Sequence, residues 1–396
     1  MPSESVEVFD NRSVARGGAG ADTSRFAARF AEEAAAFHRS IPGYSPTTLH
    51  TLPALAASLG ISEVWVKDES TRFGLKAFKG LGGSYAIAGV LAGRLGRDVA
   101  GVTFGDLTSP GAKAALGDLV FATATDGNHG RGVAWAAQQL GQQAAVFLPS
   151  HAAPVRVERI RGHGAETTVT DCNYDDTVRI VAAEAERHGW VLIQDTAWEG
   201  YEEVPVWIMQ GYLTMLAEAL EQAGEPPTHL FAQASVGSFA GALQGYLVER
   251  YGARRPLLGL VEPLAMASFF ASVRAGDGRS RAITDAHDET IMACLAAGEN
   301  NPLAWPILRD HADFFVRCPD RVTESGMRSL AHPGGGDPRV VSGESGAVTA
   351  GLLVEAGNEG RLFGELQLDA GSKVLVFSTE GAGDPESYRR ITGTEP

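Results

Sequence analysis

The sequence predicts an α/β fold with two open, mostly parallel sheets flanked by helices. The first observation is that short apolar segments alternate with longer helical stretches between residues 119 and 194. The second is a further series of such segments between residues 229 and 377. Strands that alternate with helices in this way form parallel βαβ units. The third is a content of 48 glycines, many of them directly after expected strands, where open α/β sheets bind ligands.

The individual elements follow from local patterns along the chain. Residues 1–24 are polar, contain several glycines and are expected to be loose. Apolar residues at helical spacing predict a helix over residues 25–39. A loop with prolines follows, and an apolar strand is expected at residues 63–67. The later strands are expected at residues 119–123, 144–148, 166–169, 190–193, 229–233, 257–261, 313–316 and 373–377.

The length of 396 residues fits two domains, or one large domain that carries an insertion. The two series of strands favour an α/β domain inserted into the sequence of another. We expect a large domain formed by residues 1–87 and 209–396 and a small inserted α/β domain formed by residues 88–208.

Composition limits the class of protein and of partner. With 44% hydrophobic and 20% charged residues, and no apolar run long enough to cross a bilayer, the chain is typical of a globular protein. The net charge of −15 opposes binding to nucleic acid or to an anionic membrane. A small molecule is therefore the expected partner.

Cysteine usage and the first residues indicate the compartment. Cys172, Cys294 and Cys318 lie far apart and show no CxxC spacing, so we expect neither a metal site nor a redox pair. The first residues lack a basic region followed by an apolar one, so no export signal is expected. Both observations favour a reducing cytoplasm.

Residues 77–86 place one lysine, Lys79, beside small residues at the start of an apolar helix. A lysine forms an imine with an aldehyde cofactor only as the free amine, and burial lowers its pKa. Lys79 is therefore a candidate pyridoxal phosphate lysine. The alternative is a solvated helix residue, which is the more common place for a lysine considered by itself.

A polar loop follows the expected strand at residues 119–123. It contains Asp126, Asn128 and two glycines and leads into a helix. Because glycine lets the main chain come close to a ligand, this loop can hold a carboxylate or a phenolic oxygen through amide groups. The alternative is a helix cap made by Asp126 or Asn128.

A second loop, rich in small residues, follows the expected strand at residues 229–233. Its residues Val236, Gly237, Ser238, Phe239 and Ala240 lie at a helix start, where backbone N–H groups can hold a phosphate. The segment departs from the GxGxxG pattern, and Glu262 is only a remote candidate for a ribose-binding acid. A single phosphate is therefore favoured over a dinucleotide. The alternative is close helix packing with no ligand.

Three further polar positions are candidates near strand ends. Ser378 or Thr379 follows the last strand and can face a ring nitrogen. Glu344 is either an acid in the first turn of a helix or a pocket residue. Asp195 follows a strand and is flanked by aromatic residues, so its carboxyl can have a raised pKa and act as an acid or base. The alternative for Asp195 is a surface turn.

In this order, the segments resemble the fold-type II pyridoxal phosphate enzymes, whose architecture is like that of the tryptophan synthase β-subunit. Within them they are similar to the diaminopropionate ammonia-lyases. The likeness covers roughly residues 44–389. It is carried by VKDES (66–70), RFGL and AFK (72–79), TDGNHGRGVAWAAQQLG (125–141), NYDDTVR (173–179), QDTAWEGY (194–201), WIMQGY (207–212), SGESGAV (342–348) and STEG (378–381).

The resemblance implies a cofactor and a role for each candidate residue. Lys79 would carry pyridoxal 5'-phosphate as a Schiff base, Asn128 would contact the ring oxygen, and Phe78 and Glu344 would line the cofactor site. The loop from Val236 to Ala240 would hold the phosphate. A neutral partner for the ring nitrogen, Ser378 or Thr379, would favour elimination over transamination.

The resemblance also implies the reaction. Asp126 would remove the α-proton of a D-substrate, Lys79 that of the L-isomer, and Asp195 would position the substrate or assist the loss of its amine. The reaction would be the α,β-elimination of 2,3-diaminopropionate to pyruvate and ammonia through aminoacrylate. Enzymes of this fold type are commonly dimers, so a homodimer is expected.

Departures from the family pattern leave other substrates open. The phosphate loop reads SVGSFAGAL instead of GVGxMAGG, Lys76 replaces an expected asparagine, and AAGENNPLAW lacks the cysteine of ACGEPNPLGW. A dehydratase-like or β-replacement enzyme for another β-substituted amino acid is the second interpretation. The third is a catalytically silent module that binds pyridoxal phosphate or an amino acid. A dinucleotide-dependent dehydrogenase is disfavoured because its fingerprint is missing.

Overall fold

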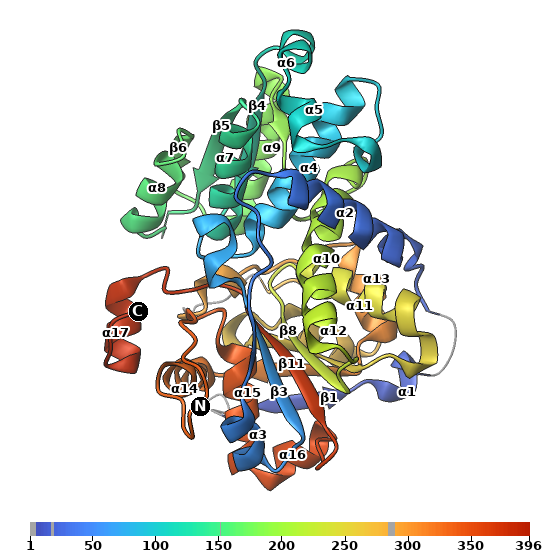
Figure 1. Ribbon diagram of the computed structural model, residues 1–396, viewed down its shortest axis with the longest axis vertical. Coiled ribbons are helices and arrows are strands. Elements are labelled where there is room, and N and C mark those ends of the chain that lie inside the picture. Colours follow the sequence, from blue (N-terminus) through green and yellow to red (C-terminus); the bar gives the residue numbers. More distant parts are fainter. Residues whose placement is uncertain (1–4, 17–19, 151, 284–289) are drawn as a thin grey trace. The chain divides into compact units, whose positions relative to one another are not determined.

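The computed structural model describes residues 5–16, 20–150, 152–283 and 290–396 (Figure 1). The chain divides into two compact units. The first unit comprises Met1–Ser24, Thr47–Lys76 and Glu218–Pro396, and the second comprises Arg25–Pro46 and Ala77–Ala217. The domain boundaries expected at residues 87/88 and 208/209 stay a prediction.

Within the described residues, the first unit contains a seven-stranded sheet in the order β1-β10-β9-β8-β11-β3-β2. Its interior pairs are parallel, and β1 and β2 are antiparallel to their neighbours at the two edges. The interior strands are runs of apolar residues because helices cover both faces of a parallel sheet. The strands are β1 (Glu7–Asp10), β2 (Leu49–Thr51), β3 (Glu63–Asp68), β8 (His229–Gln233), β9 (Leu257–Pro263), β10 (Phe314–Cys318) and β11 (Lys373–Ser378).

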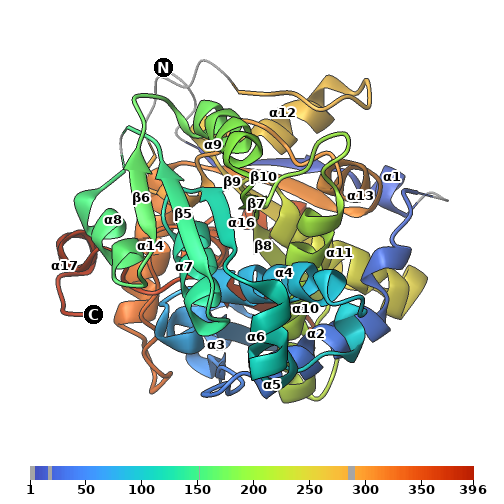
Figure 2. The same ribbon diagram turned by 90° about the horizontal axis from the view of Figure 1, so that it is seen from above.

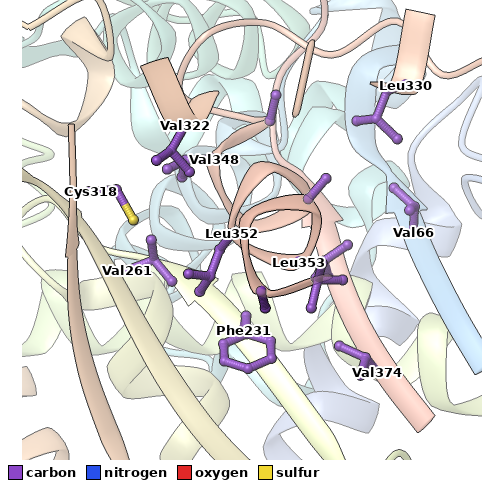
Figure 3. Close-up of a cluster of buried hydrophobic side chains, with 14 of the residues drawn as sticks. Val66, Phe231, Val261, Cys318, Val322, Leu330, Val348, Leu352, Leu353 and Val374 are labelled. Carbon is purple, nitrogen blue, oxygen red and sulfur yellow. The ribbon is translucent and has the colours of Figure 1, made fainter. Parts of the chain in front are cut away.

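The main core of the first unit lies between this sheet and helix α15 (Val348–Asn358). Figure 3 shows Leu352 and Leu353 of this helix close to Phe231 and Val374 of the strands. The other helices of the unit are α1 (Arg12–Ala15), α3 (Pro53–Leu59), α11 (Ser238–Tyr251), α12 (Ser268–Ala275), α13 (Ala304–His311), α14 (Asp320–Ala331), α16 (Gly360–Glu365) and α17 (Pro385–Thr392).

The second unit contains a parallel four-stranded sheet in the order β6-β5-β4-β7 among its described residues. Right-handed crossovers place α7 and α8 on one face and α9 on the other (Figure 2). The strands are β4 (Val120–Ala124), β5 (Gln143–Leu148), β6 (Glu166–Val169) and β7 (Val191–Leu192). The helices are α2 (Ala28–Ser40), α4 (Lys79–Arg94), α5 (Phe104–Thr108), α6 (Pro110–Leu116), α7 (Asn128–Gln139), α8 (Pro154–Arg161), α9 (Tyr174–His188) and α10 (Glu203–Ala223), whose last residues belong to the first unit.

The two mostly parallel sheets flanked by helices confirm the expected fold class. One local expectation was wrong, because part of the segment 1–24 is ordered as strand β1. This strand pairs antiparallel with β10, Val6 is 1% exposed, and Glu7 forms an ion pair with Arg317 at 2.6 Å. Pairing with an existing sheet edge, and not local propensity, orders these polar residues.

No helix in the described ranges combines the length and the apolar character needed to cross a membrane. The same ranges contain no disulfide among Cys172, Cys294 and Cys318.

Candidate active site

Lys79 is the first residue of α4, and its amine is paired with a carboxylate. Nζ donates a hydrogen bond to Oδ2 of Asp195 at 2.7 Å, and the Lys79 side chain is 18% exposed. The amine also lies 5.3 Å from the ring centroid of Phe78 and 5.5 Å from that of Tyr212. The interpretation of Lys79 as a solvated helix residue is therefore wrong.

The pKa of Lys79 is shifted in the direction opposite to the one expected from the sequence. Burial disfavours the ammonium form, but the Asp195 carboxylate and the Tyr212 hydroxyl outweigh burial and raise the pKa of Lys79. The expected lowering was wrong because it considered burial alone and not the partner. Lys79 must pass its proton to another group before its amine can act as a nucleophile.

Asp195 follows β7 and is 3% exposed, so it is not part of a surface turn. Besides the bond from Lys79, its Oδ1 accepts a hydrogen bond from the Tyr174 hydroxyl at 3.3 Å, and Nδ1 of His129 lies 3.8 Å from its Oδ2. Burial alone would raise the pKa of Asp195, but Lys79 and His129 outweigh it and lower the pKa. The expected raised pKa was wrong for this residue, and Asp195 stays ionised.

Within the group around Lys79, Asp126 is a carboxyl group whose pKa is raised. Burial raises the pKa of Asp126 to about 7, against an opposing effect of Arg156, and the negative charges of Asp175 and Asp195 add to the increase. Nη1 of Arg156 donates to the backbone oxygen of Asp126 at 2.8 Å and holds the loop. A carboxyl group with a pKa near neutrality can accept a proton and release it again at physiological pH.

The start of α7 is organised by Thr125. Its Oγ1 accepts hydrogen bonds from the backbone N–H groups of Gly127 and Gly130, both at 2.9 Å. The N-cap residue of α7 is Gly127. Asp126 and Asn128 are therefore not the cap of this helix, and the cap interpretation was wrong.

Glycine brings the helices of this site together. A Cβ atom on Gly132 of α7 would lie 2.8 Å from the backbone carbon of Lys79. A Cβ atom on Gly211 of α10 would lie 2.7 Å from the backbone oxygen of Leu81. Both contacts are too short for any side chain, so only glycine allows α7 and α10 to pack against the start of α4.

Several polar residues of the site carried no predicted role, although they lie in motifs that the sequence analysis quotes. Gln194 links Asp195 to β4, because its Oε1 accepts from Oγ1 of Thr123 at 3.0 Å and its Nε2 donates to the Tyr174 hydroxyl at 2.9 Å. His129 donates from Nε2 to the Ile193 oxygen at 2.8 Å. In the sequence, these residues could have been identified as polar side chains at positions that are expected to be buried.

The candidate phosphate loop lies in the first unit, at the start of α11. Gly237 adopts φ +92°, and a Cβ there would lie 2.3 Å from Cζ of Phe269. Asn301 fixes the loop, because its backbone N–H donates to the Val236 oxygen at 2.8 Å and its Nδ2 donates to Oγ of Ser238 at 2.7 Å. The loop therefore presents backbone N–H groups at the positive end of a 14-residue helix.

The other candidates of the first unit are buried at the end of β11 and near α15. Ser378 and Thr379 are 1% and 5% exposed, and Oγ of Ser378 donates to Oγ of Ser342 at 2.8 Å. Glu344 precedes α15, which begins at Val348, so it is not in the first turn of that helix.

The remaining acidic candidate, Glu262, has a structural role. Its side chain accepts from the backbone N–H groups of Phe269 and Phe270 at 2.9 and 2.8 Å. It thereby satisfies the amides at the start of α12 and is not the ribose-binding acid of a dinucleotide site.

These residues fit the chemistry of pyridoxal phosphate. A lysine amine suits an aldehyde, the glycine-containing start of α11 suits a phosphate, and the Ser378 hydroxyl, whose O–H can rotate away from Ser342, can donate a hydrogen bond to an unprotonated ring nitrogen. Comparison with known proteins agrees, because residues 41–376 match the family model described as "Pyridoxal-phosphate dependent enzyme". The chain belongs to this family.

Relatives within the pyridoxal-phosphate dependent enzymes confirm the resemblance noted in the sequence. A diaminopropionate ammonia-lyase of Salmonella typhimurium is 48% identical over 94% of both chains. One of Escherichia coli K12 is 46% identical over 98% of this chain and 96% of its own. The crystal structure of an Escherichia coli diaminopropionate ammonia-lyase in complex with an aminoacrylate-PLP azomethine reaction intermediate is 45% identical, with a TM-score of 0.88 over 98% and 97% of the chains.

A more distant structure shows the shared fold. Processed threonine deaminase isoform 2 of Solanum lycopersicum is 16% identical, with a TM-score of 0.73 over 98% of this chain and 96% of its own. The fold-type II architecture is thus confirmed.

Gly237→Ala is expected to weaken the binding of pyridoxal phosphate by about tenfold or more, because the added Cβ would displace either the loop or Phe269. Titration of the apoenzyme with the cofactor, followed by absorbance, measures this change. Gly276→Ala is a matched control, since Gly276 also has a left-handed φ, of +68°, but no atom within 4 Å of an added Cβ. Equal cofactor affinity in both variants would contradict a role of this loop in holding the phosphate.

Proposed function

We propose that this chain catalyses the α,β-elimination of 2,3-diaminopropionate, as the D-isomer, the L-isomer or both, to pyruvate and ammonia with pyridoxal 5'-phosphate. The observation that carries the proposal is the partly buried group of Lys79, Asp195 and Asp126, in which one carboxyl group stays ionised and the other has a pKa of about 7. The relatives that are 46–48% identical and named diaminopropionate ammonia-lyase support it.

The residues that would hold the cofactor are those that the resemblance implies. Lys79 would bind its aldehyde carbon, with Phe78 beside it, and Asn128 would contact the ring oxygen. The loop from Val236 to Ala240 would hold the phosphate, Ser378 or Thr379 would face the ring nitrogen, and Glu344 would line the site. When bound, pyridoxal phosphate supplies the conjugated system that accepts the electrons left by the loss of the α-proton.

The protein's own groups would move the protons. Asp126, half ionised near pH 7, would take the α-proton of the D-isomer at its carboxylate oxygen. Nζ of Lys79 would take that of the L-isomer after it has lost its own proton. Two bases would thus serve the two configurations at the α-carbon.

Asp195 would orient the substrate and assist the departure of the β-amine. Its low pKa keeps it anionic, so it can hold an ammonium group. Tyr174 bonds to the carboxylate, and Gln194 bonds to Tyr174 and to β4, so the carboxylate is fixed in place. A neutral Ser378 hydroxyl cannot keep a ring nitrogen protonated, which favours elimination over transamination.

We also propose that the enzyme is a cytoplasmic homodimer. Support for the compartment comes from the three widely spaced cysteines. Support for the dimer comes only from the likeness to fold-type II enzymes. Light scattering on the purified holoenzyme tests the dimer, and a molar mass near the 41.7 kDa of one chain would contradict it.

The test of the reaction is the release of ammonia and pyruvate from D- and L-diaminopropionate, with L-serine and L-threonine as comparators. We expect kcat/KM for at least one diaminopropionate isomer to exceed that for serine by about a hundredfold or more, which corresponds to roughly 3 kcal/mol of discrimination. A larger kcat/KM for serine would favour the dehydratase interpretation. Bound cofactor without turnover of any amino acid would favour the silent binding module.

A further inference from the structure

A cavity with a volume of about 670 Å³ is lined by residues that all belong to the second unit. Its wall includes the aromatic residues Phe30, Tyr85 and Trp207, and none of the candidate active-site residues lines it. Its size is in the range of cavities that bind small molecules.

Tyr85 is the most informative residue in this wall. Tyr85 is 0% exposed, and its Oη has no hydrogen-bond partner among the described residues. Its ring packs beside Phe37 and His38, with centroids 6.0 and 6.1 Å apart. Since buried polar groups in folded proteins are almost always hydrogen-bonded, this hydroxyl calls for a partner from outside the chain, which is a water molecule or a ligand.

The charges around the hydroxyl favour a cationic partner. Glu33 and Asp98 line the cavity, and after burial their negative charges are the largest causes that raise the pKa of Tyr85. Burial and the nearby Asp98 also raise the pKa of Glu33, with a smaller opposing effect of Arg29. Negative charge therefore exceeds positive charge beside the hydroxyl, and a bound cation would relieve this excess.

The remaining wall favours an organic cation over an inorganic ion. Phe30 and Trp207 present apolar and aromatic surface, on which alkylammonium groups bind through burial and cation–π attraction. An anion is disfavoured because the guanidinium group of Arg29 lies over the Phe30 ring, 4.6 Å from its centroid, and Arg25 and Arg29 are outnumbered in the wall by carboxylates. These carboxylates belong to Glu33, Asp98, Glu202 and Glu203.

We propose that this cavity binds a small organic ammonium ion, whose N–H group bonds to Oη of Tyr85, whose charge is balanced by the carboxylate of Glu33, and whose alkyl groups pack on Phe30 and Trp207. The proposal does not depend on the reaction catalysed at Lys79.

The test is isothermal titration calorimetry of the holoenzyme with trimethylammonium chloride. This probe carries one N–H group and, as a tertiary amine, cannot form a Schiff base with the cofactor. We expect saturable binding of trimethylammonium, and no binding of tert-butanol, a neutral molecule of similar size with three methyl groups, over the same concentration range. Equal binding of tert-butanol or the absence of saturable binding would overturn the proposal. It would also be overturned if potassium chloride competed for the cavity as strongly as trimethylammonium chloride does.

Two variants test whether the ammonium ion binds in this cavity. Tyr85→Phe removes only the hydroxyl and is expected to weaken binding by about tenfold, the value of one hydrogen bond. Glu33→Gln is expected to weaken it at least as much, whereas Glu32→Gln, at an exposed neighbour that does not line the cavity, is expected to leave it unchanged. Unchanged binding in Tyr85→Phe, or equal loss in the Glu32 and Glu33 variants, would overturn the proposal.

Thermal unfolding of the unliganded Tyr85→Phe variant gives an independent readout. Removal of a buried hydroxyl without a partner is expected to leave the Tm unchanged or to raise it. A clear decrease in Tm would show that the hydroxyl already has a partner within the protein and would contradict the proposal.

Discussion

Lys79→Ala is expected to abolish the covalent attachment of pyridoxal phosphate and to lower kcat/KM by at least about a thousandfold. The variant loses both the amine that binds the aldehyde and the base for one substrate isomer. It also leaves Asp195 buried without its ion-pair partner. The measurements are the visible absorbance of the purified protein, mass spectrometry after borohydride reduction, and ammonia release.

Lys76→Ala is the matched control for this experiment. Lys76 lies three positions before Lys79, but its side chain is exposed. Its backbone has a φ of 51°, a left-handed conformation that asparagine tolerates well, and this agrees with the asparagine expected there. The control should keep its absorbance and its borohydride adduct. An adduct that persists in Lys79→Ala would show that another lysine carries the cofactor.

Asp126→Asn is expected to lower kcat/KM for D-diaminopropionate by about a hundredfold to ten-thousandfold, the range typical for the loss of a general base. The loss for the L-isomer should be much smaller, since Lys79 serves that isomer. Separate assays with the two pure isomers measure the difference. Equal losses for both isomers would contradict the assignment of different bases.

The control for Asp126→Asn is Asp176→Asn, which removes the same charge from an exposed position. The Asp176 side chain is 53% exposed, and its ion pair with Arg179 lies on the surface. This variant should retain its activity on both isomers.

The pH dependence of the D-isomer reaction follows from the same residue. A general base acts when it is ionised, and the pKa of Asp126 is raised to about 7. The value of kcat/KM for the D-isomer should therefore fall about tenfold per pH unit below this pKa and level off above it. A profile that is flat between about pH 5 and 8 would show that Asp126 is not the base, because its ionisation would then not control the rate.

Much of the candidate site was accessible from local sequence patterns. Apolar runs correctly predicted the interior strands, such as β3 and β11. The small residues around Lys79 correctly predicted that this lysine lies at the start of an apolar helix. The same holds for the start of α11, where a glycine was expected beside a ligand and where Gly237 adopts a left-handed backbone. Local patterns suffice here because periodicity and glycine act within a few residues of the chain.

Only the tertiary structure determined which groups of the site are ionised and which segment forms the edge strand β1. Lys79 and Asp195 are 116 positions apart, and their pairing reversed the pKa directions expected for both residues, while Asp126 acquired the raised pKa. Strand β1 likewise exists because β10 offers it an unpaired edge. The physical reason is that a pKa or an edge pairing depends on the distance between groups in space, whereas propensity and periodicity describe only neighbours along the chain.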